Sequence, residues 1–165
     1  MRRLRALCGA AALGAASTLA WAAGSGPYDP AIDANEQLEA AGRQAQATNR
    51  RVLVIVGGNW CTWCRALDGL IAENDEVRGE VERRFVVVHV NYSKENKNPA
   101  VMARLGNPDK LGFPVLVVLS PSLGVLHTQE TGSLETGDPK TPGHDPGRVV
   151  AFARAWGPGG GTESL

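Results

Sequence analysis

Two cysteines separated by two residues, Cys61 and Cys64, are the side chains of this sequence best suited to chemistry. The β-branched run 51–56 ends just before them at Gly57-Gly58, and apolar residues at helical spacing follow them. Cys61 is therefore expected at a helix N-terminus, where unpaired backbone N–H groups and the helix dipole favour a thiolate. Cys64, one turn later, can reach the same sulfur. An exposed attacking thiol with a sheltered second thiol is the arrangement that thiol–disulfide exchange uses.

Three other uses of a cysteine pair fit the sequence less well. A c-type haem site requires histidine after the second cysteine, but residue 65 is Arg65. A zinc site needs four ligands, so His89, His127 and His144 would have to converge from two strands and a loop. A purely structural disulfide of this spacing closes too short a loop to stabilise the fold much. Redox exchange is the favoured interpretation, with no metal and no cofactor, while a metal clip and a structural disulfide stay open as alternatives.

The first 22 residues are typical of a cleavable secretory signal peptide. A basic start precedes the uncharged apolar run 6–19, and Ala20-Trp21-Ala22 supplies the small-x-small pattern of a cleavage site. The run is shorter than the roughly 20 residues that cross a bilayer. An uncleaved membrane anchor is the alternative, and both interpretations predict that the domain lies outside the cytoplasm, in the periplasm.

Composition predicts one folded domain, because 43% of the 165 residues are apolar and 21% are charged. The formal net charge is zero and no basic stripe runs along the chain, which argues against nucleic acid as a partner. Cleavage after Ala22 removes Cys8 and three arginines, and leaves a mildly acidic domain with two cysteines. In an oxidising compartment such a pair is either a working disulfide or a metal clip.

The remaining sequence predicts an α/β fold with a central mixed sheet of four or five strands and helices on both faces. We expect one domain over 23–157, preceded by the signal peptide and followed by a disordered tail, 158–165. The first helix is expected to be capped by Asp29-Pro30. A break is expected at Asn74-Asp75 inside the helical pattern that follows the cysteines. The expected elements are helix 32–49, strand 51–56, helices either side of that break, strand 85–90, helix 99–105, strands 115–119 and 125–129, loop 130–147 and helix 149–156.

The motif W-C-T-W-C at 60–64 resembles the thioredoxin superfamily, and most closely its secreted bacterial members with a W-C-x-W-C motif. A second landmark is G-F-P at 112–114, immediately ahead of the expected strand 115–119. The family carries a cis-proline at that place, packed against the cysteine pair. The resemblance covers about residues 30–156, and it implies the thioredoxin-like fold.

The resemblance also implies roles for individual residues. Cys61 is expected to be the nucleophile that attacks a substrate disulfide, and Cys64 the resolver that forms the Cys61–Cys64 disulfide and releases the substrate. Pro114 takes the cis-proline position. Phe113, which precedes it, is expected to offer backbone groups to the substrate peptide.

Two tryptophans and one departure from the family complete the expected site. Trp60 matches the aromatic residue that shields the cysteines, or is a core aromatic, and Trp63 is either a substrate-facing or a packing residue. Thioredoxins keep a buried aspartate six residues before the first cysteine, to assist proton transfer at the resolver, and here that place is Ile55. Proton transfer must then use water or another carboxylate, with Glu73 and Asp68 as candidates.

The resulting prediction is a monomeric periplasmic enzyme that exchanges disulfides with protein disulfide or dithiol substrates, in the reducing direction. The resemblance implies that a reductase in that compartment receives its electrons from a membrane thiol transporter. The alternatives are an oxidase or isomerase, a role in cytochrome maturation, and a binding module that holds a client or metal with little turnover. The sequence does not decide whether the loop 131–147 borders the site.

Overall fold

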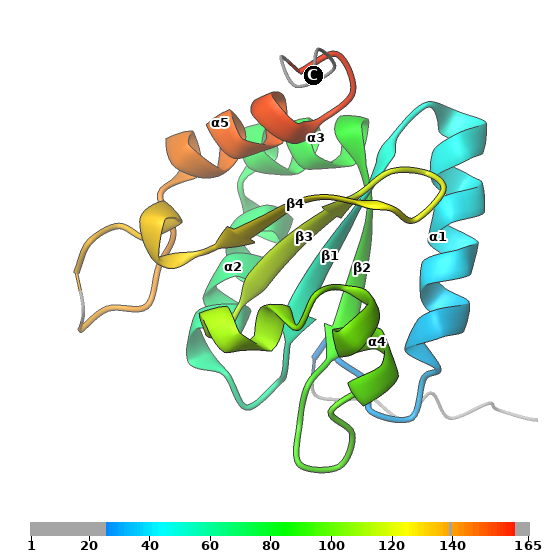
Figure 1. Ribbon diagram of the computed structural model, residues 1–165. Helices are drawn as coiled ribbons and strands as arrows, with labels where there is room; N and C mark the ends of the chain where they lie inside the picture. Colours follow the sequence, from blue (N-terminus) through cyan, green and yellow to red (C-terminus); the bar gives the residue numbers. More distant parts are fainter. Residues whose placement is uncertain (1–25, 139, 161–165) are drawn as a thin grey trace, which may run out of the picture.

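Four strands form one mixed sheet in the computed structural model, which describes residues 26–138 and 140–160 (Figure 1). They lie in the order β2-β1-β3-β4; β1 is parallel to β2 and antiparallel to β3, and β4 is antiparallel to β3. The predicted α/β architecture is confirmed, with four strands. The strands are β1 (Arg51–Gly57), β2 (Phe85–Asn91), β3 (Val115–Leu119) and β4 (Val125–Glu130).

Helices cover both faces of this sheet (Figure 1). One face carries α1 (Ala34–Thr48) and α4 (Pro99–Arg104). The other face carries α2 (Thr62–Glu73), α3 (Asp75–Arg84) and α5 (Pro146–Trp156). Two short 3₁₀ helices, Pro108–Leu111 and Gly132–Leu134, lie in the connections.

The central strand β1 explains the two-sided core. Its residues 52–56 are all at most 2% exposed, as a continuous β-branched run predicts for a strand covered on both faces. Alternate side chains point to opposite layers, so Leu53 and Ile55 pack under α2, α3 and α5. Val54 and its neighbours on the other face pack under α1 and α4. The strand ends at Gly57, four residues before Cys61.

The observed helix ends confirm one prediction from the sequence and contradict another. Asn74 ends α2 and begins α3, and its Oδ1 accepts from the backbone N–H of Val77 at 3.0 Å, which confirms the expected break. The expected cap of the first helix was wrong. Asp33, not Asp29, is the N-cap of α1, and its Oδ1 accepts from the N–H of Asn35 at 2.8 Å. Asp29 closes a separate local turn before the helix.

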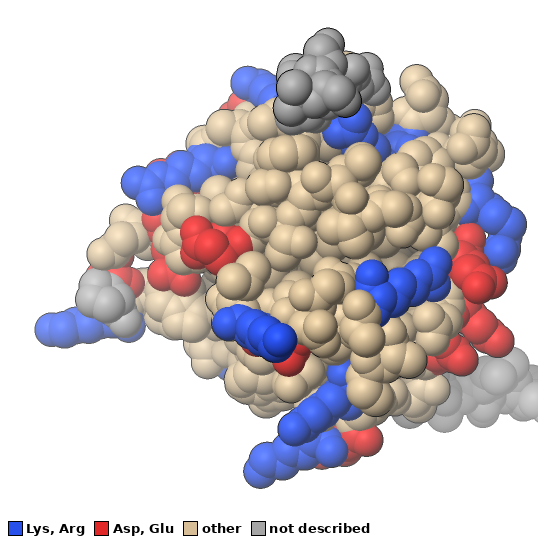
Figure 2. Space-filling view, viewed as in Figure 1, with Lys and Arg blue, Asp and Glu red and all other residues tan. Residues whose placement is uncertain are grey.

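The two ends of the chain fall largely outside the description. The predicted signal peptide, 1–22, lies outside the described residues. Of the predicted tail, 158–160 follow α5 in a turn closed by a hydrogen bond from Gly160 N–H to Gly157 O, and 161–165 are not described. Among the described helices, none is both long and apolar enough to span a membrane. Lys and Arg are interspersed with Asp and Glu on the face shown in Figure 2.

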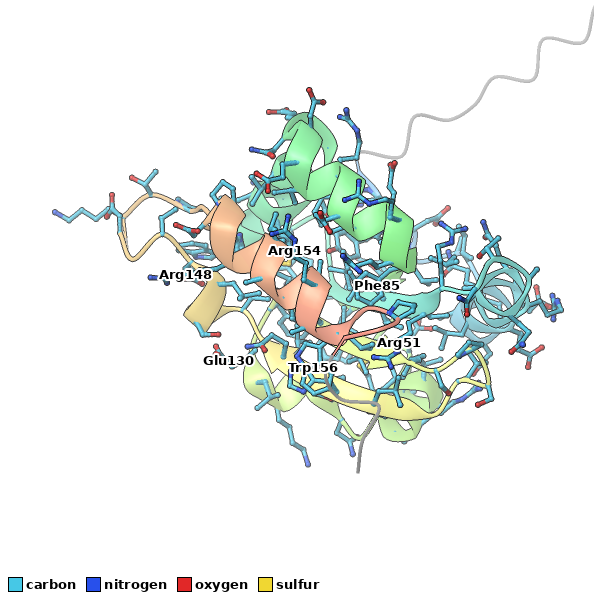
Figure 3. All side chains as sticks on the ribbon, turned by 90° about the horizontal axis from the view of Figure 1, so that it is seen from above. Arg51, Phe85, Glu130, Arg148, Arg154 and Trp156 are labelled. Atoms are coloured by element: carbon cyan, nitrogen blue, oxygen red, sulfur yellow. A yellow bond between two sulfur atoms is a disulfide. The ribbon has the colours of Figure 1, made fainter. Side chains whose placement is uncertain are left out.

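A buried carboxylate joins α3 to α5. Glu80 is 6% exposed and pairs with Arg83 at 2.5 Å, Arg84 at 3.0 Å and Arg154 at 3.0 Å. Figure 3 shows Arg154 reaching from α5 to the α3 side, where it also meets the exposed Glu76. The hydrogen bond from Arg154, with those from the other arginines, holds the pKa of Glu80 below its ordinary value.

We expect Glu80→Gln to destabilise the protein at neutral pH and to lose this effect in acid. A carboxyl whose pKa is lowered by folding stabilises the fold above its unfolded pKa, and this contribution disappears as the pH falls through the folded pKa. Urea unfolding of both proteins, compared at about pH 7 and about pH 3, measures the difference. Glu76→Gln is the matched control, since an exposed pair contributes little. Equal destabilisation by Glu80→Gln at both pH values would contradict the ionic role.

Candidate active site

Cys61 is the N-cap of α2, at the point where the chain leaves the sheet. Its Sγ accepts from the backbone N–H of Cys64 at 3.1 Å, so one of the free N–H groups of the helix points at this sulfur. The two residues form a disulfide with Cα atoms 5.2 Å apart. Cys61 is 5% exposed and Cys64 is fully buried. The pair therefore has an outer sulfur that a partner can approach and an inner sulfur enclosed by the core.

The loop before β3 lies against the outer sulfur. The Phe113–Pro114 peptide bond is cis, and the carbonyl oxygen of Phe113 lies 3.7 Å from Cys61 Sγ. Gly112 has a φ of 90°, a backbone conformation that favours glycine. The buried hydroxyl of Thr131 donates to the carbonyl of Pro114 at 2.7 Å and ties this loop to the end of β4. The backbone of Phe113 is thus fixed beside the disulfide.

An aromatic rim surrounds the outer sulfur. Trp60 is 58% exposed, so it is not a core aromatic. Its indole N–H donates to the carbonyl of Tyr92 at 2.8 Å, and its ring meets Phe113 edge-to-face at 5.7 Å. The ring of Tyr92 also packs against Phe113, with ring centroids 4.8 Å apart. An exposed indole held in one orientation is a preformed apolar contact surface.

Trp63 was expected either to face the substrate or to pack against the core, and it does both. It is half-buried, packs against the core under α2, and meets His144 edge-to-face at 6.0 Å. It also borders the groove over the disulfide, so it both packs and faces the approach to Cys61. The groove has a volume of about 540 Å³ and is lined by Trp60, Cys61, Thr62, Trp63, Phe113 and Pro142.

The loop 131–147, whose place the sequence left open, borders this groove through Pro142. Its His144 is 4% exposed and bridges to Glu135 through the backbone. Burial lowers the pKa of His144. Neither ring nitrogen has a hydrogen-bond partner among the described residues. No local pattern in the sequence distinguished this histidine from an ordinary loop residue.

The three histidines do not converge. His89 pairs with Asp68 at 2.8 Å, His127 stacks on Trp156 with ring centroids 3.6 Å apart, and His144 contacts Trp63. Within residues 26–138 and 140–160, no group of three or more His, Cys, Asp or Glu side chains is placed to hold a metal ion. The described histidines are therefore not placed to complete a metal site with the two cysteines.

The inner sulfur faces a polar cluster that the sequence did not reveal. Ile55 is fully buried beneath α2, where thioredoxins have their aspartate. Tyr28, only 1% exposed, lies in the same core as Cys64, and its ring meets His89 edge-to-face at 5.1 Å. Of the two candidate carboxylates, Asp68 pairs with His89 in this region, whereas Glu73 is exposed at the far end of α2.

A cysteine pair at a helix N-terminus, opposed by a cis-proline loop on a mixed four-stranded sheet, is the arrangement of a thioredoxin-like protein. The chain belongs to the thioredoxin-like family, whose sequence profile matches residues 33–121 and so includes both cysteines and Pro114. The chain is also similar to solved structures. The crystal structure of a disulphide isomerase from Xylella fastidiosa Temecula1 is 28% identical with a TM-score of 0.65, over 77% of this chain and 93% of that one. A structure described as DsbH oxidoreductase is 20% identical with a TM-score of 0.49, over 68% and 76% of the two chains.

Proposed function

We propose that this protein is a thiol–disulfide oxidoreductase that reduces protein disulfides, with Cys61 as nucleophile and Cys64 as resolver. One observation carries the proposal: the outer sulfur is capped by a helix N–H and lies in an aromatic groove, while the inner sulfur is completely enclosed. That asymmetry allows only one of the two cysteines to meet a substrate. The 28% identical neighbour, described as a disulphide isomerase, supports the same class of chemistry.

The reaction follows from these positions. The Cys61 thiolate attacks one sulfur of a substrate disulfide, the substrate's other sulfur leaves as a thiolate, and a mixed disulfide forms on Cys61. Cys64 then attacks Cys61 Sγ, which breaks the mixed disulfide and releases the second substrate sulfur. The protein loses two electrons and closes the Cys61–Cys64 disulfide, and the substrate gains two thiols. A membrane thiol transporter is the proposed source of the electrons that reopen the disulfide.

Substrate binding is proposed at the rim of the groove. Phe113 presents its backbone beside Cys61, which suits an extended peptide that pairs through main-chain hydrogen bonds. Trp60 and Trp63 offer apolar surfaces in the groove that Cys61 also lines. Such a site recognises backbone shape and apolar side chains more than charge.

The reducing direction rests on what stands between the cysteines. Thr62 and Trp63 carry no charge, so neither stabilises a Cys61 thiolate electrostatically. Strong stabilisation of the thiolate makes a CxxC protein an oxidant, and its lack favours a lower potential. We further propose that the domain, 23–157, works as a monomer in the periplasm after removal of residues 1–22, for which the signal-like N-terminal pattern is the support.

The reduction potential of the pair tests this proposal. Protein equilibrated in graded thiol/disulfide buffers is followed by tryptophan fluorescence, since Trp60 and Trp63 flank the disulfide. We expect a potential near about −250 mV or lower, in the range of reductants such as thioredoxin. A potential of about −150 mV or higher would instead indicate an oxidase or isomerase. If the titration shows no reversible two-electron transition, the binding module becomes the better interpretation.

A further inference from the structure

Tyr28 brings a hydroxyl close to the resolving sulfur. A Cβ atom built on Gly57 would lie 2.6 Å from Cys64 Sγ and 3.2 Å from the Tyr28 hydroxyl oxygen. The sulfur and the hydroxyl therefore lie on one side of Gly57, separated by at most the sum of those distances. Both residues are almost wholly buried, at 0% and 1% exposure.

The position of Tyr28 is fixed from two directions. Its backbone N–H donates to Asn59 Oδ1 at 3.3 Å, and its carbonyl accepts from Asn59 Nδ2 at 2.7 Å. This reciprocal pair ties residue 28 to the loop just ahead of Cys61. The edge-to-face contact with His89 holds the ring from the side of β2.

Two buried oxygens in this cluster lack hydrogen-bond partners among the described residues: the hydroxyl of Tyr28 and Oδ2 of Asp68. Burial first, and then the negative charge of Asp68, raise the pKa of Tyr28 far above its ordinary value. Tyr28 thus stays protonated, and it can transfer a proton only while it receives another. A buried hydroxyl that makes no other hydrogen bond among the described residues is free to take part in proton transfer at the nearby Cys64 Sγ.

Asp68 links this cluster to solvent. It lies four residues after Cys64 on α2, hence one helical turn further along the same face. Its Oδ1 pairs with His89 Nε2 at 2.8 Å, and both side chains are partly exposed. The two residues line a groove of about 840 Å³ that is bordered by neither cysteine nor by Trp60, Trp63 or Phe113.

We propose that Tyr28 and Asp68 form the proton path of the resolving cysteine, and that this path opens on the groove of Asp68 and His89 rather than on the substrate side. The inference rests on the proposed function. The Tyr28 hydroxyl accepts the proton of the Cys64 thiol and donates its own to the Asp68 carboxylate. Cys64 becomes the thiolate that attacks Cys61 Sγ, and Asp68 becomes neutral until the proton passes to His89 or solvent. Asp68 does not contact the reacting sulfur and acts on it only through Tyr28.

This path supplies a proton acceptor for the Cys64 thiol, which Ile55 cannot do. The position of Glu73 excludes it as the acceptor. Glu73 is exposed and lies nine residues after Cys64 on the same helix, roughly 14 Å along the axis. The other charged groups around the groove are Arg50, Arg78 and Glu82. Both arginines donate to backbone carbonyls, Arg50 to Glu82 and Phe85, and Arg78 to Ala72.

Reaction of the reduced protein with Ellman's reagent separates the two chemical steps. Cys61 attacks the reagent and releases one thionitrobenzoate, and Cys64 then displaces the second from the mixed disulfide. In a stopped-flow experiment at neutral pH, we expect Asp68→Asn to slow the second release at least about tenfold and to leave the first nearly unchanged, since a general base contributes about 10²–10⁴-fold. Tyr28→Phe is expected to slow the same release. Glu73→Gln is the matched control on the same helix, and both of its phases should stay within about twofold of the parent.

The pH profile separates proton transfer from a structural defect. Well above the pKa of the Cys64 thiol, the thiolate forms without help, so the second release in Asp68→Asn should approach the parent rate. The direction of the rate change in Asp68→Asn at neutral pH also separates the two explanations. Removing a negative charge near Cys64 favours its thiolate and by itself would speed the step, so slowing identifies the loss of a proton acceptor.

Three results in the variants would overturn the path. The rate of the second release could be unchanged in both Tyr28→Phe and Asp68→Asn, or it could stay slow in Asp68→Asn at high pH. It could also fall as much in Glu73→Gln as in Asp68→Asn. If Asp68→Asn fails to fold, as judged by its unfolding transition, Tyr28→Phe decides, since it keeps the buried ring. The reaction needs no protein substrate. A parent that releases two equivalents but reduces no protein disulfide would therefore refute the proposed function and leave the path in place, and a parent without a second release would refute the path.

Discussion

Cys61→Ser is expected to reduce disulfide exchange to background, a loss of more than about 10³-fold, whereas Cys64→Ser stops the reaction halfway. Only Cys61 Sγ borders the groove, so a serine there leaves no sulfur that a substrate can meet. Cys64 is fully buried and acts only on Cys61, so its replacement spares the first attack. The Cys64→Ser protein should accumulate as a mixed disulfide with its substrate.

Two peptides joined by one disulfide, one of them fluorescent, serve as the substrate. Mass spectrometry of the Cys64→Ser protein should show one peptide attached, and a reducing agent should remove it. Thr62→Ser is the matched control, because residue 62 lines the groove and carries no sulfur. A Cys61→Ser protein that still bound the peptide tightly, beside a parent with no exchange, would favour the binding module. Attachment to Cys64 in the Cys61→Ser protein would contradict the assignment of nucleophile and resolver.

The parts of the site that could be predicted are those with local sequence signals. Residues 52–56 of β1 are apolar at every position, which predicts a strand that is buried on both faces. The helix after it begins at the cysteine because Gly57-Gly58 ends the strand and the apolar spacing then changes. Local signals did not predict the start of α1 correctly, because two nearby segments could each cap the helix. Asp29-Pro30 and Asp33 both have the residue types of a helix cap, and in the structure Asp33 is the residue that caps α1.

The polar cluster behind Cys64 could not be predicted, because no local pattern contains it. Tyr28 is 36 residues from Cys64 along the chain, and it reaches the core through contacts with Asn59 and His89. Asp68 was a candidate only as one of two carboxylates on the helix. Separating it from Glu73 requires the helix to be placed on the sheet, since that placement partly buries the Asp68 side chain and leaves the Glu73 side chain exposed.

Gly57→Ala is expected to destabilise the oxidised protein by about 1–3 kcal/mol, the usual range for overpacking a core. The backbone of Gly57 lies outside the left-handed region, so an alanine meets only a lack of space. Its methyl group would lie 2.6 Å from Cys64 Sγ and 3.2 Å from the Tyr28 hydroxyl. The disulfide prevents that sulfur from moving away. Urea unfolding of the oxidised protein measures the loss.

Reduction should relieve part of this overpacking, because a free Cys64 side chain can rotate away from residue 57. The Gly57→Ala disulfide is then easier to reduce. We expect its potential to rise by up to about 20–60 mV, the shift that complete relief of about 1–3 kcal/mol would give at about 1.4 kcal/mol per 30 mV. Gly69→Ala on α2 is the matched control. A Cβ at that position meets nothing within 4 Å, so we expect about 0.5–1 kcal/mol of added stability and an unchanged potential. Equal destabilisation of the oxidised and reduced Gly57→Ala proteins would show that Tyr28, rather than the sulfur, opposes the added methyl group.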